Sequence, residues 1–103
     1  MAEKFSGVHW MLATPFHDDE SIDSVSIGNL VDKAVSSGCQ GMVCLGVTGE
    51  AARLIDRERY QVAETVIQRS QGLQVTVGTT AGSTAAAIDR SKEAQELGAA
   101  AVM

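Results

Sequence analysis

The 103-residue sequence has few aromatic residues, a single proline, only two cysteines and an excess of acidic over basic side chains. Aromatics make up 4% of the residues, so any core must be built mainly from aliphatic side chains. No apolar run approaches the roughly 20 residues that a membrane helix needs. The net charge of −5 argues against nucleic acid as a partner, because phosphate binding requires clustered Lys and Arg. We therefore expect neither a nucleic-acid-binding nor a membrane-spanning protein.

The two cysteines, Cys39 and Cys44, are not expected to form a disulfide. Five residues of extended chain span roughly 16 Å, whereas a disulfide needs Cα atoms within roughly 7 Å. Two reduced thiols in or near a core fit a cytoplasmic protein. Residues 1–5 also lack the apolar segment of a secretory signal, which supports the same expectation.

Short apolar runs alternate with helical patterns along the whole chain. We predict strands that begin near positions 8, 41, 73 and 99. The first helix should start at an N-cap formed by Asp23 or Ser24 and stop at Gly38. Its apolar stripe follows helical spacing through Ile27, Leu30, Val31, Ala34 and Val35.

Two further helices follow the second and third strands. One should be capped near Asp56 and end at Gly72. We expect its inward face to contain Tyr60, Ala63, Val66 and Ile67. The other should be capped by Ser83 or Thr84, run through Leu97 and close at Gly98.

The predicted order is βαβαβαβ, which is typical of a parallel α/β sheet with right-handed crossovers. An open doubly wound sheet and a closed barrel both fit this order. The chain stops on an apolar strand that needs cover on both faces. The simplest interpretation is that residues 1–103 form one incomplete domain, the first part of a (β/α)8 TIM barrel, which takes roughly 250 residues when complete.

The segment Gly46-Val47-Thr48-Gly49-Glu50 is the most informative motif, because it falls where the second strand ends. Ligands bind at the carboxyl ends of strands in α/β proteins. Glycines allow close backbone approach, exposed N–H groups favour anions and the Thr48 hydroxyl adds a donor. No Walker-type Gly-Lys-Ser/Thr follows, which disfavours a nucleotide phosphate loop. A plain βα turn is the alternative for the pentapeptide alone.

Taken together, ordered motifs along the chain resemble the dihydrodipicolinate synthase / N-acetylneuraminate lyase family of class I aldolases. The resemblance covers essentially the whole chain. It rests on Gly7-Val8, Thr14-Pro15-Phe16, Ile22-Asp23, Leu30-Val31, Gly38-x-x-Gly41, Leu45-Gly46-Val47-Thr48-Gly49-Glu50, Leu54, Glu58-Arg59, Thr84, Ala94 and Gly98-Ala99.

The resemblance implies a barrel enzyme that condenses or cleaves pyruvate or a related 2-oxo acid. A lysine near the end of a sixth strand would form a Schiff base with the substrate, and a tyrosine would assist proton transfer. Thr48 would bind the substrate carboxylate, and Val47 would contribute its backbone N–H. No metal or cofactor is implied, and the full-length protein is expected to be a homo-oligomer.

Two features depart from the family pattern. Val47 stands where the family usually has a Thr or Ser that joins a proton relay, so strict dihydrodipicolinate synthase activity is put in doubt. The three lysines, Lys4, Lys33 and Lys92, fall away from the predicted carboxyl ends of strands. We therefore expect no catalytic residue in this chain, which alone should be inactive because the family's lysine and relay tyrosines would lie beyond Met103.

The remaining polar residues have simpler explanations than chemistry. His9 and His17 are interpreted as packed or exposed side chains, and residues 18–20 as a solvated turn without metal-site spacing. Arg53, Arg57 and Arg59 are expected to form a helix-surface ion network with Asp56 and Glu58. Two other functions remain open: a non-catalytic α/β module that associates with itself, and a phosphate-binding α/β domain.

Overall fold

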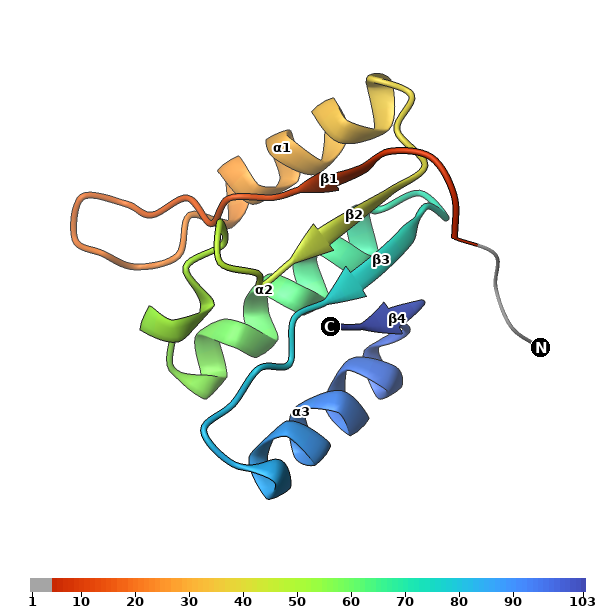
Figure 1. Ribbon diagram of the computed structural model, residues 1–103. Helices are drawn as coiled ribbons and strands as arrows, with labels where there is room; N and C mark the ends of the chain where they lie inside the picture. Colours follow the sequence, from red (N-terminus) through yellow and green to blue (C-terminus); the bar gives the residue numbers. More distant parts are fainter. Residues whose placement is uncertain (1–4) are drawn as a thin grey trace.

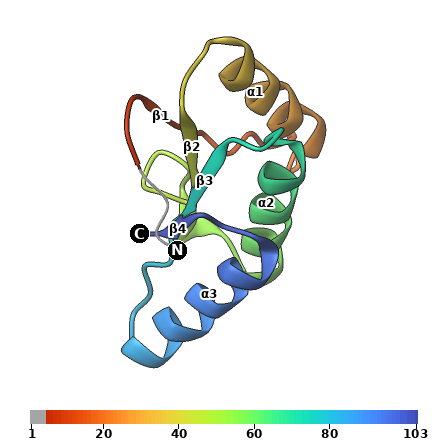
Figure 2. The ribbon, with the colours of Figure 1, turned by 90° about the vertical axis from the view of Figure 1, so that its right-hand side faces the viewer.

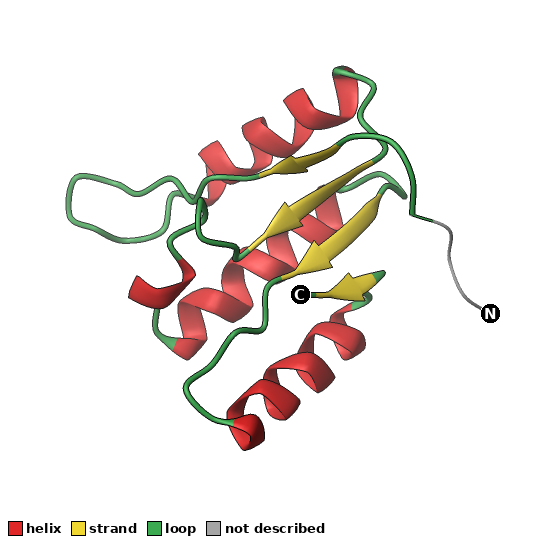
Figure 3. Ribbon diagram, in the orientation of Figure 1, coloured by secondary structure: helices red, strands yellow, loops and turns green. Residues whose placement is uncertain are grey.

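The computed structural model describes residues 5–103 and contains one parallel sheet with the strand order β1-β2-β3-β4 (Figure 1). The strands are β1 (His9–Met11), β2 (Gly41–Cys44), β3 (Gln74–Val77) and β4 (Ala101–Val102). The helices are α1 (Ser24–Ser36), α2 (Asp56–Arg69) and α3 (Thr84–Leu97), with a short 3-10 turn, η1 (Ala51–Arg53), before α2. Strands and helices alternate as predicted, and every strand pair is parallel (Figure 3).

All three helices lie on the same face of the sheet (Figure 2). A doubly wound sheet carries helices on both faces, so this arrangement favours the barrel over the open alternative. The main core lies between the sheet and the helices; its largest fully buried side chains are Met42, Val31, Val66 and Cys44. The opposite face of the sheet has no helix over it in the described part of the chain.

The register of the sheet places Met11, Val43, Thr76 and Ala101 side by side, one from each strand. Neighbouring residues in register point to the same face of a sheet. Met11 and Val43 are partners in register and face away from the helices, because Met42, the residue before Val43 in β2, is fully buried on the helix side. This row therefore marks the face that would line the inside of a barrel.

The ends of α1 and α3 confirm the predicted capping residues, whereas α2 is capped by Ile55 and ends at Arg69, three residues before Gly72. The Asp23 side chain accepts a hydrogen bond from the Ser26 N–H at 3.0 Å, and the Ser83 hydroxyl accepts one from the Ala86 N–H at 3.2 Å. Gly38 and Gly98 follow the ends of α1 and α3 with φ of 84° and 102°. This left-handed backbone is the conformation that favours glycine after a helix.

Helix α2 begins at Asp56 as expected, but its buried face is rotated from the predicted one. Arg59, Val62, Ala63 and Val66 are buried, whereas Tyr60 is 40% exposed. The prediction that Tyr60 packs inward is therefore wrong. Ala63 and Val66 are common to the predicted and the observed face, and Arg59 and Val62 complete the observed one.

Both cysteines are buried and unpaired, in agreement with the prediction of reduced thiols near the core. Burial raises the pKa of the Cys44 thiol to about 12, so Cys44 stays protonated at neutral pH and is a packing residue. Within residues 5–103, no helix has the length and apolar character to span a membrane.

Candidate functional site

A tight loop follows β2 at the carboxyl edge of the sheet. Leu45 and Glu50 both adopt left-handed backbone conformations, with φ of 60° and 56°. Such conformations cost a non-glycine residue roughly 1–3 kcal/mol, so neighbouring contacts must hold them. The Glu50 N–H donates to the Val47 carbonyl at 2.9 Å, and the Ala51 N–H to the Gly46 carbonyl at 3.4 Å. These bonds close the loop around residues 46–50.

Three consecutive N–H groups in this loop have no acceptor in the described chain; two belong to exposed residues, Val47 and Thr48, and the third to the buried Gly49. In the described part of the chain, the N–H groups of Val47, Thr48 and Gly49 donate to no acceptor, and neither does the Thr48 hydroxyl. Thr48 is exposed and Val47 is 95% exposed. Unsatisfied backbone donors beside a hydroxyl suit a carboxylate or phosphate oxygen. Both predicted site residues thus lie together at the carboxyl edge of β2.

The loop is anchored from the end of β1 by Thr14. The Thr14 hydroxyl is buried and donates to the Gly49 carbonyl at 2.6 Å. A side chain at Gly49 would lie within 3.3 Å of Leu45, Leu12 and Thr14 atoms, so only glycine fits without displacement. In the sequence, Thr14 stands out only as part of the Thr14-Pro15-Phe16 motif. Its role could have been suspected from a hydroxyl placed at a strand end.

A second anchor connects the loop to the end of β3. A Cβ atom on Gly78 would lie 1.9 Å from the Leu45 carbonyl oxygen, so the two backbones touch. The Gly78 N–H donates to the Cys44 carbonyl, and its own carbonyl accepts a 2.8 Å bond from the Arg59 guanidinium. Arg59 is only 5% exposed. Burial first, and then the nearby Arg90, lower the pKa of Arg59, but a guanidinium remains charged in proteins.

The predicted surface network of arginines is therefore wrong for Arg59, which holds a backbone carbonyl in the interior. Arg53 pairs with Glu50 at 3.5 Å instead of with Asp56. Asp56 pairs at 3.5 Å with Arg90 of α3. Within residues 5–103, no ion pair joins Arg53, Arg57 or Arg59 to Asp56 or Glu58, so the predicted network is wrong.

A hollow of about 410 Å³ opens beside the loop. Its walls come from the loop, from η1 and from the ends of β3 and β4, and they include Leu45, Val47, Ala51, Arg53, Thr80 and Met103. Most of the lining is apolar, and its polar side chains are those of Glu50, Arg53 and Thr80. A hollow of this size accommodates a small molecule whose charged end faces the loop.

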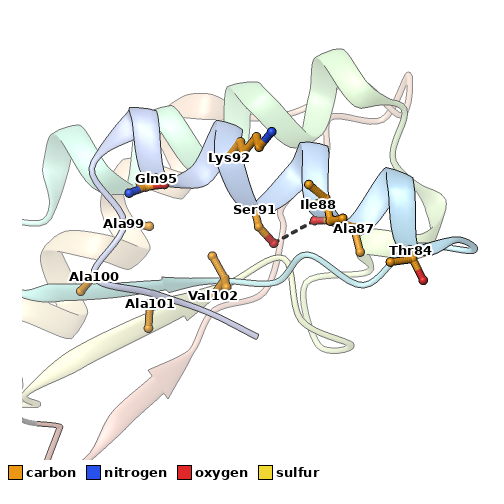
Figure 4. Close-up of a pocket in the computed structure, with 10 residues that line it drawn as sticks. All are labelled: Thr84, Ala87, Ile88, Ser91, Lys92, Gln95, Ala99, Ala100, Ala101 and Val102. Carbon is orange, nitrogen blue, oxygen red and sulfur yellow. Dashed lines mark hydrogen bonds between the residues drawn. The ribbon is translucent and has the colours of Figure 1, made fainter. Parts of the chain in front are cut away.

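A second hollow, of about 530 Å³, lies between α3 and β4 (Figure 4). Ile88 of α3 and Val102 of β4 lie on its two walls, and the Ser91 hydroxyl is already bonded to the Ala87 carbonyl at 2.8 Å. The only charged residue along it is Lys92. This groove contains none of the predicted site residues and lacks converging polar groups.

The two lysines in residues 5–103 lie away from the carboxyl edge of the sheet. Lys33 is exposed near the end of α1, and Lys92 is exposed in α3. Lys4 lies outside the described residues. Lys33 belongs to α1 and Lys92 to α3, whereas Thr48 belongs to the loop that follows β2.

The other polar candidates are accounted for by local contacts. His9 packs against Phe5 and bonds the Ser6 carbonyl at 3.2 Å. His17 is exposed, 3.9 Å from Asp23. The Asp19 carboxylate accepts bonds from the Ser21 hydroxyl and N–H, which lower its pKa. Across residues 5–103, no group of three or more His, Cys, Asp or Glu side chains is placed to hold a metal.

A parallel sheet with helices on one face, and with its donor-rich loop at the carboxyl ends of the strands, defines the chain as the N-terminal part of a (β/α)8 barrel. Residues 4–103 match the model of the dihydrodipicolinate synthetase family. The chain therefore belongs to this family.

Individual relatives agree with this assignment. The 4-hydroxy-tetrahydrodipicolinate synthase of Laribacter hongkongensis is 40% identical over 93 residues, which are 89% of this chain and 32% of the relative. A dihydrodipicolinate synthase structure from Rhodopseudomonas palustris superposes with a TM-score of 0.92 at 40% identity, over 96% of this chain and 33% of that one. The enzyme from Acinetobacter baumannii, solved in complex with pyruvate, has a TM-score of 0.90 at 34% identity, over 93% and 33%. The chain thus spans about a third of the length of these relatives.

Proposed function

We propose that residues 46–50 bind the carboxylate of pyruvate or a related 2-oxo acid, as part of a class I aldolase or lyase. The observation that supports carboxylate binding most directly is that the N–H groups of Val47, Thr48 and Gly49 have no acceptor in the described chain. The Thr48 hydroxyl adds a fourth donor, and the hollow beside the loop leaves room for the rest of a small oxo acid. The related enzyme from Acinetobacter baumannii that is described with pyruvate supports this ligand class.

The chemistry of such an aldolase needs a lysine that attacks the substrate ketone and releases water, which forms an imine. The protonated imine withdraws electrons, so a carbanion can form on the adjacent carbon. By family resemblance this lysine belongs near the end of a sixth strand, beyond Met103. Lys33 and Lys92 lie on helices, away from the loop. We infer that the 103-residue chain binds the oxo acid but does not turn it over.

Val47 limits which reactions of the family the site can support, because its side chain cannot transfer a proton. Its side chain is 95% exposed and lines the hollow, but it has no hydroxyl group. Its N–H can hold a carboxylate oxygen, whereas the side chain cannot pass a proton. A proton relay through this position is therefore absent, and a family member acting on a different oxo acid or aldehyde fits as well as a strict dihydrodipicolinate synthase. The two reduced thiols fit an enzyme of the cytoplasm.

Carboxylate binding can be tested by titrating pyruvate into the isotope-labelled 103-residue chain and following its amide NMR signals. The Val47, Thr48 and Gly49 amides should shift most, and Thr48→Val should weaken binding about tenfold, since a hydrogen bond to a charged group contributes roughly 1.5 kcal/mol or more. Thr84→Val is the matched control, because Thr84 is also exposed but starts α3. Shifts spread evenly over the surface, or equal effects of the two variants, would refute the carboxylate site. Stronger binding of inorganic phosphate than of pyruvate would favour the phosphate-binding alternative.

The inference that the chain has no lysine able to form an imine is tested separately with borohydride, which reduces an imine to a stable amine. Treatment of the chain with pyruvate and borohydride should leave its mass unchanged. A longer family protein that contains the sixth strand should gain one covalent adduct under the same conditions. An adduct on Lys33 or Lys92 would show that the reactive lysine has been misplaced. We propose that such a longer protein is a homo-oligomer; one related synthase is described as the first monomeric variant.

A further inference from the structure

The hydroxyl of Thr14 is the point at which the segment after β1 contacts the loop after β2. It donates to the Gly49 carbonyl at 2.6 Å, and Thr14 is only 4% exposed, so water does not compete for this bond. Gly49 packs against the same segment, because a Cβ atom there would lie 3.3 Å from the Leu12 carbonyl oxygen and from the Thr14 hydroxyl. All of these groups belong to residues 12–50, so the contact is formed wholly inside this part of the chain.

The bond from Thr14 completes the hold on one peptide group of the loop. The Gly49 carbonyl and the Glu50 N–H belong to a single planar unit. Its N–H donates to the Val47 carbonyl at 2.9 Å, while its carbonyl accepts from Thr14. Both polar groups of the unit are therefore bonded, and the plane cannot turn without breaking a hydrogen bond.

The orientation held in this way is not the one that the local backbone prefers. Glu50 has a φ of 56°, a left-handed conformation that is unfavourable for a residue with a side chain. Gly49 would allow the plane to turn, because glycine has few steric limits on its backbone angles. Since a turn would let Glu50 return to negative φ, the bond from Thr14 opposes a relaxation that the backbone favours.

The same peptide group determines the arrangement of the anion-binding donors. The turn that the Glu50 N–H closes contains Val47, Thr48 and Gly49, whose own N–H groups have no acceptor in the described chain. If the plane turned, this closure would be lost, and the three N–H groups would lose their common arrangement. Donors that are fixed before a ligand arrives bind it more tightly than donors that must first be ordered. Thr14 can therefore influence the ligand through the loop without touching it.

Thr14 is itself held on both sides. Leu12, two residues before it, donates its N–H to the Val43 carbonyl at 2.9 Å. Pro15, directly after it, has a fixed φ, and the Pro15 carbonyl accepts a 3.0 Å bond from the N–H of Asp23, the N-cap of α1. A continuous support thus runs from the start of α1 through the end of β1 to the loop.

We propose that Thr14 is a positioning residue of the carboxylate site: its hydroxyl fixes the Gly49–Glu50 peptide and thereby the direction of the loop's unbonded N–H groups. The inference rests on the proposed function, because the ligand of the loop is the oxo acid assigned there. The competing explanation is that the Thr14 hydroxyl only satisfies a buried carbonyl and stabilises the fold. The two explanations differ in what they predict for ligand affinity when stability is lost.

Thr14→Val keeps the shape of the side chain but removes the hydroxyl. Calorimetric titration with pyruvate should show binding about tenfold weaker than in the wild-type protein, the loss expected when one hydrogen bond to a charged group is misaligned. Thr65→Val is the matched control, because the Thr65 hydroxyl also donates to a carbonyl, that of Gln61 at 2.8 Å, but within α2. Both variants should unfold at lower urea concentration, whereas only Thr14→Val should lose affinity. Unchanged affinity in Thr14→Val, or equal losses of affinity in the two variants, would overturn the proposal.

Thr14→Ser and Thr14→Cys decide the question if the valine variant does not fold. Serine keeps the hydroxyl and should retain the affinity of the wild-type protein, whereas a thiol is a weak donor and should weaken pyruvate binding. In ligand-free protein, the amide NMR signals of Val47, Thr48 and Gly49 should stay close to their wild-type positions in Thr14→Ser and move in Thr14→Cys. If the serine and cysteine variants bind pyruvate equally, the positioning role is wrong and the carboxylate site stands. If the wild-type protein binds no pyruvate, the proposed function is wrong and the positioning role fails with it.

Discussion

The first three strands with α1 and α2 form a well-buried region, whereas α3 and β4 form a sparsely buried one. Helix α1 buries four residues and α2 buries four, but α3 buries only Ala94. Helices α1 and α2 are also joined by a 2.9 Å ion pair between Arg69 and Asp32 and by a 2.7 Å bond between Gln61 and Ser24. Between α2 and α3 there is the longer Arg90–Asp56 pair at 3.5 Å.

The difference follows from position in the sheet more than from composition. A helix in a (β/α)8 barrel packs on the strands beneath it and on a helix at each side. Helix α2 has both neighbours, but α3 has α2 on one side and an open groove on the other (Figure 4). The same βα pattern therefore yields a closed core in one place and an uncovered apolar wall in the other.

The largest effect should come from truncating matched apolar residues in the two regions. Met42 of β2 is fully buried, and Met42→Ala should lower the free energy of unfolding by about 3 kcal/mol, through lost burial and a new cavity. Ile88 of α3 is 48% exposed, and Ile88→Ala should change it by less than about 0.5 kcal/mol. Urea unfolding at one fixed protein concentration measures both. Similar losses would show that the α3 face is covered in solution.

A smaller effect should follow from removing the buried guanidinium. Arg59→Met keeps the length of the side chain but leaves the Gly78 carbonyl without its donor, which should cost about 2 kcal/mol. Arg57→Met is the control on the same helix, since Arg57 is exposed, and should be nearly neutral. If both variants unfold at the same urea concentration, the anchor between α2 and the end of β3 contributes nothing to stability. The amide signals of Leu45 and Gly46 should move only in Arg59→Met.

Sequence patterns predicted the elements, the parallel order and the caps, because these depend on residues that are close along the chain. Asp23 and Ser83 reach N–H groups three residues away. Gly98 directly follows α3, and Gly38 follows α1 after Ser37. The motif at residues 46–50 was placed correctly at a strand end for the same reason. Its role in binding stays a prediction.

What sequence patterns could not provide were contacts between distant segments. Arg59 is buried because Gly78 offers a carbonyl 19 residues away, and Thr14 reaches a loop 35 residues away. Neither partner is visible in a helical stripe or a strand run. A charged residue normally indicates the exposed face of a helix, and the contact that buries Arg59 exists only in the folded chain.

The smallest losses of stability should come from removing the N-caps of α1 and α3. The cap of α1 is a carboxylate and the cap of α3 is a hydroxyl, so the two should respond differently to pH. Ser83→Ala removes the cap of α3 and should lower the free energy of unfolding by about 1 kcal/mol at any pH, because a hydroxyl does not titrate in this range.

Asp23→Ala removes the cap of α1, and its effect on the free energy of unfolding should depend on pH. Bonds from the Ser26 hydroxyl and then the Ser26 N–H lower the pKa of Asp23 in the folded protein. The stabilisation by Asp23 is therefore fully present above the unfolded pKa of about 3.9 and is lost as the pH falls through the lower folded value.

Wild-type protein and Asp23→Ala should thus differ in melting temperature at pH 7 and converge in strong acid, while wild-type protein and Ser83→Ala keep a constant difference. Asp19 also has a lowered pKa, but it is present in all three proteins and cancels in the comparison. A pH-independent gap for Asp23→Ala would mean that the carboxylate charge does not contribute to the cap. In that case the two caps would be equivalent, and the contrast between the regions would rest on the packing of α3 alone.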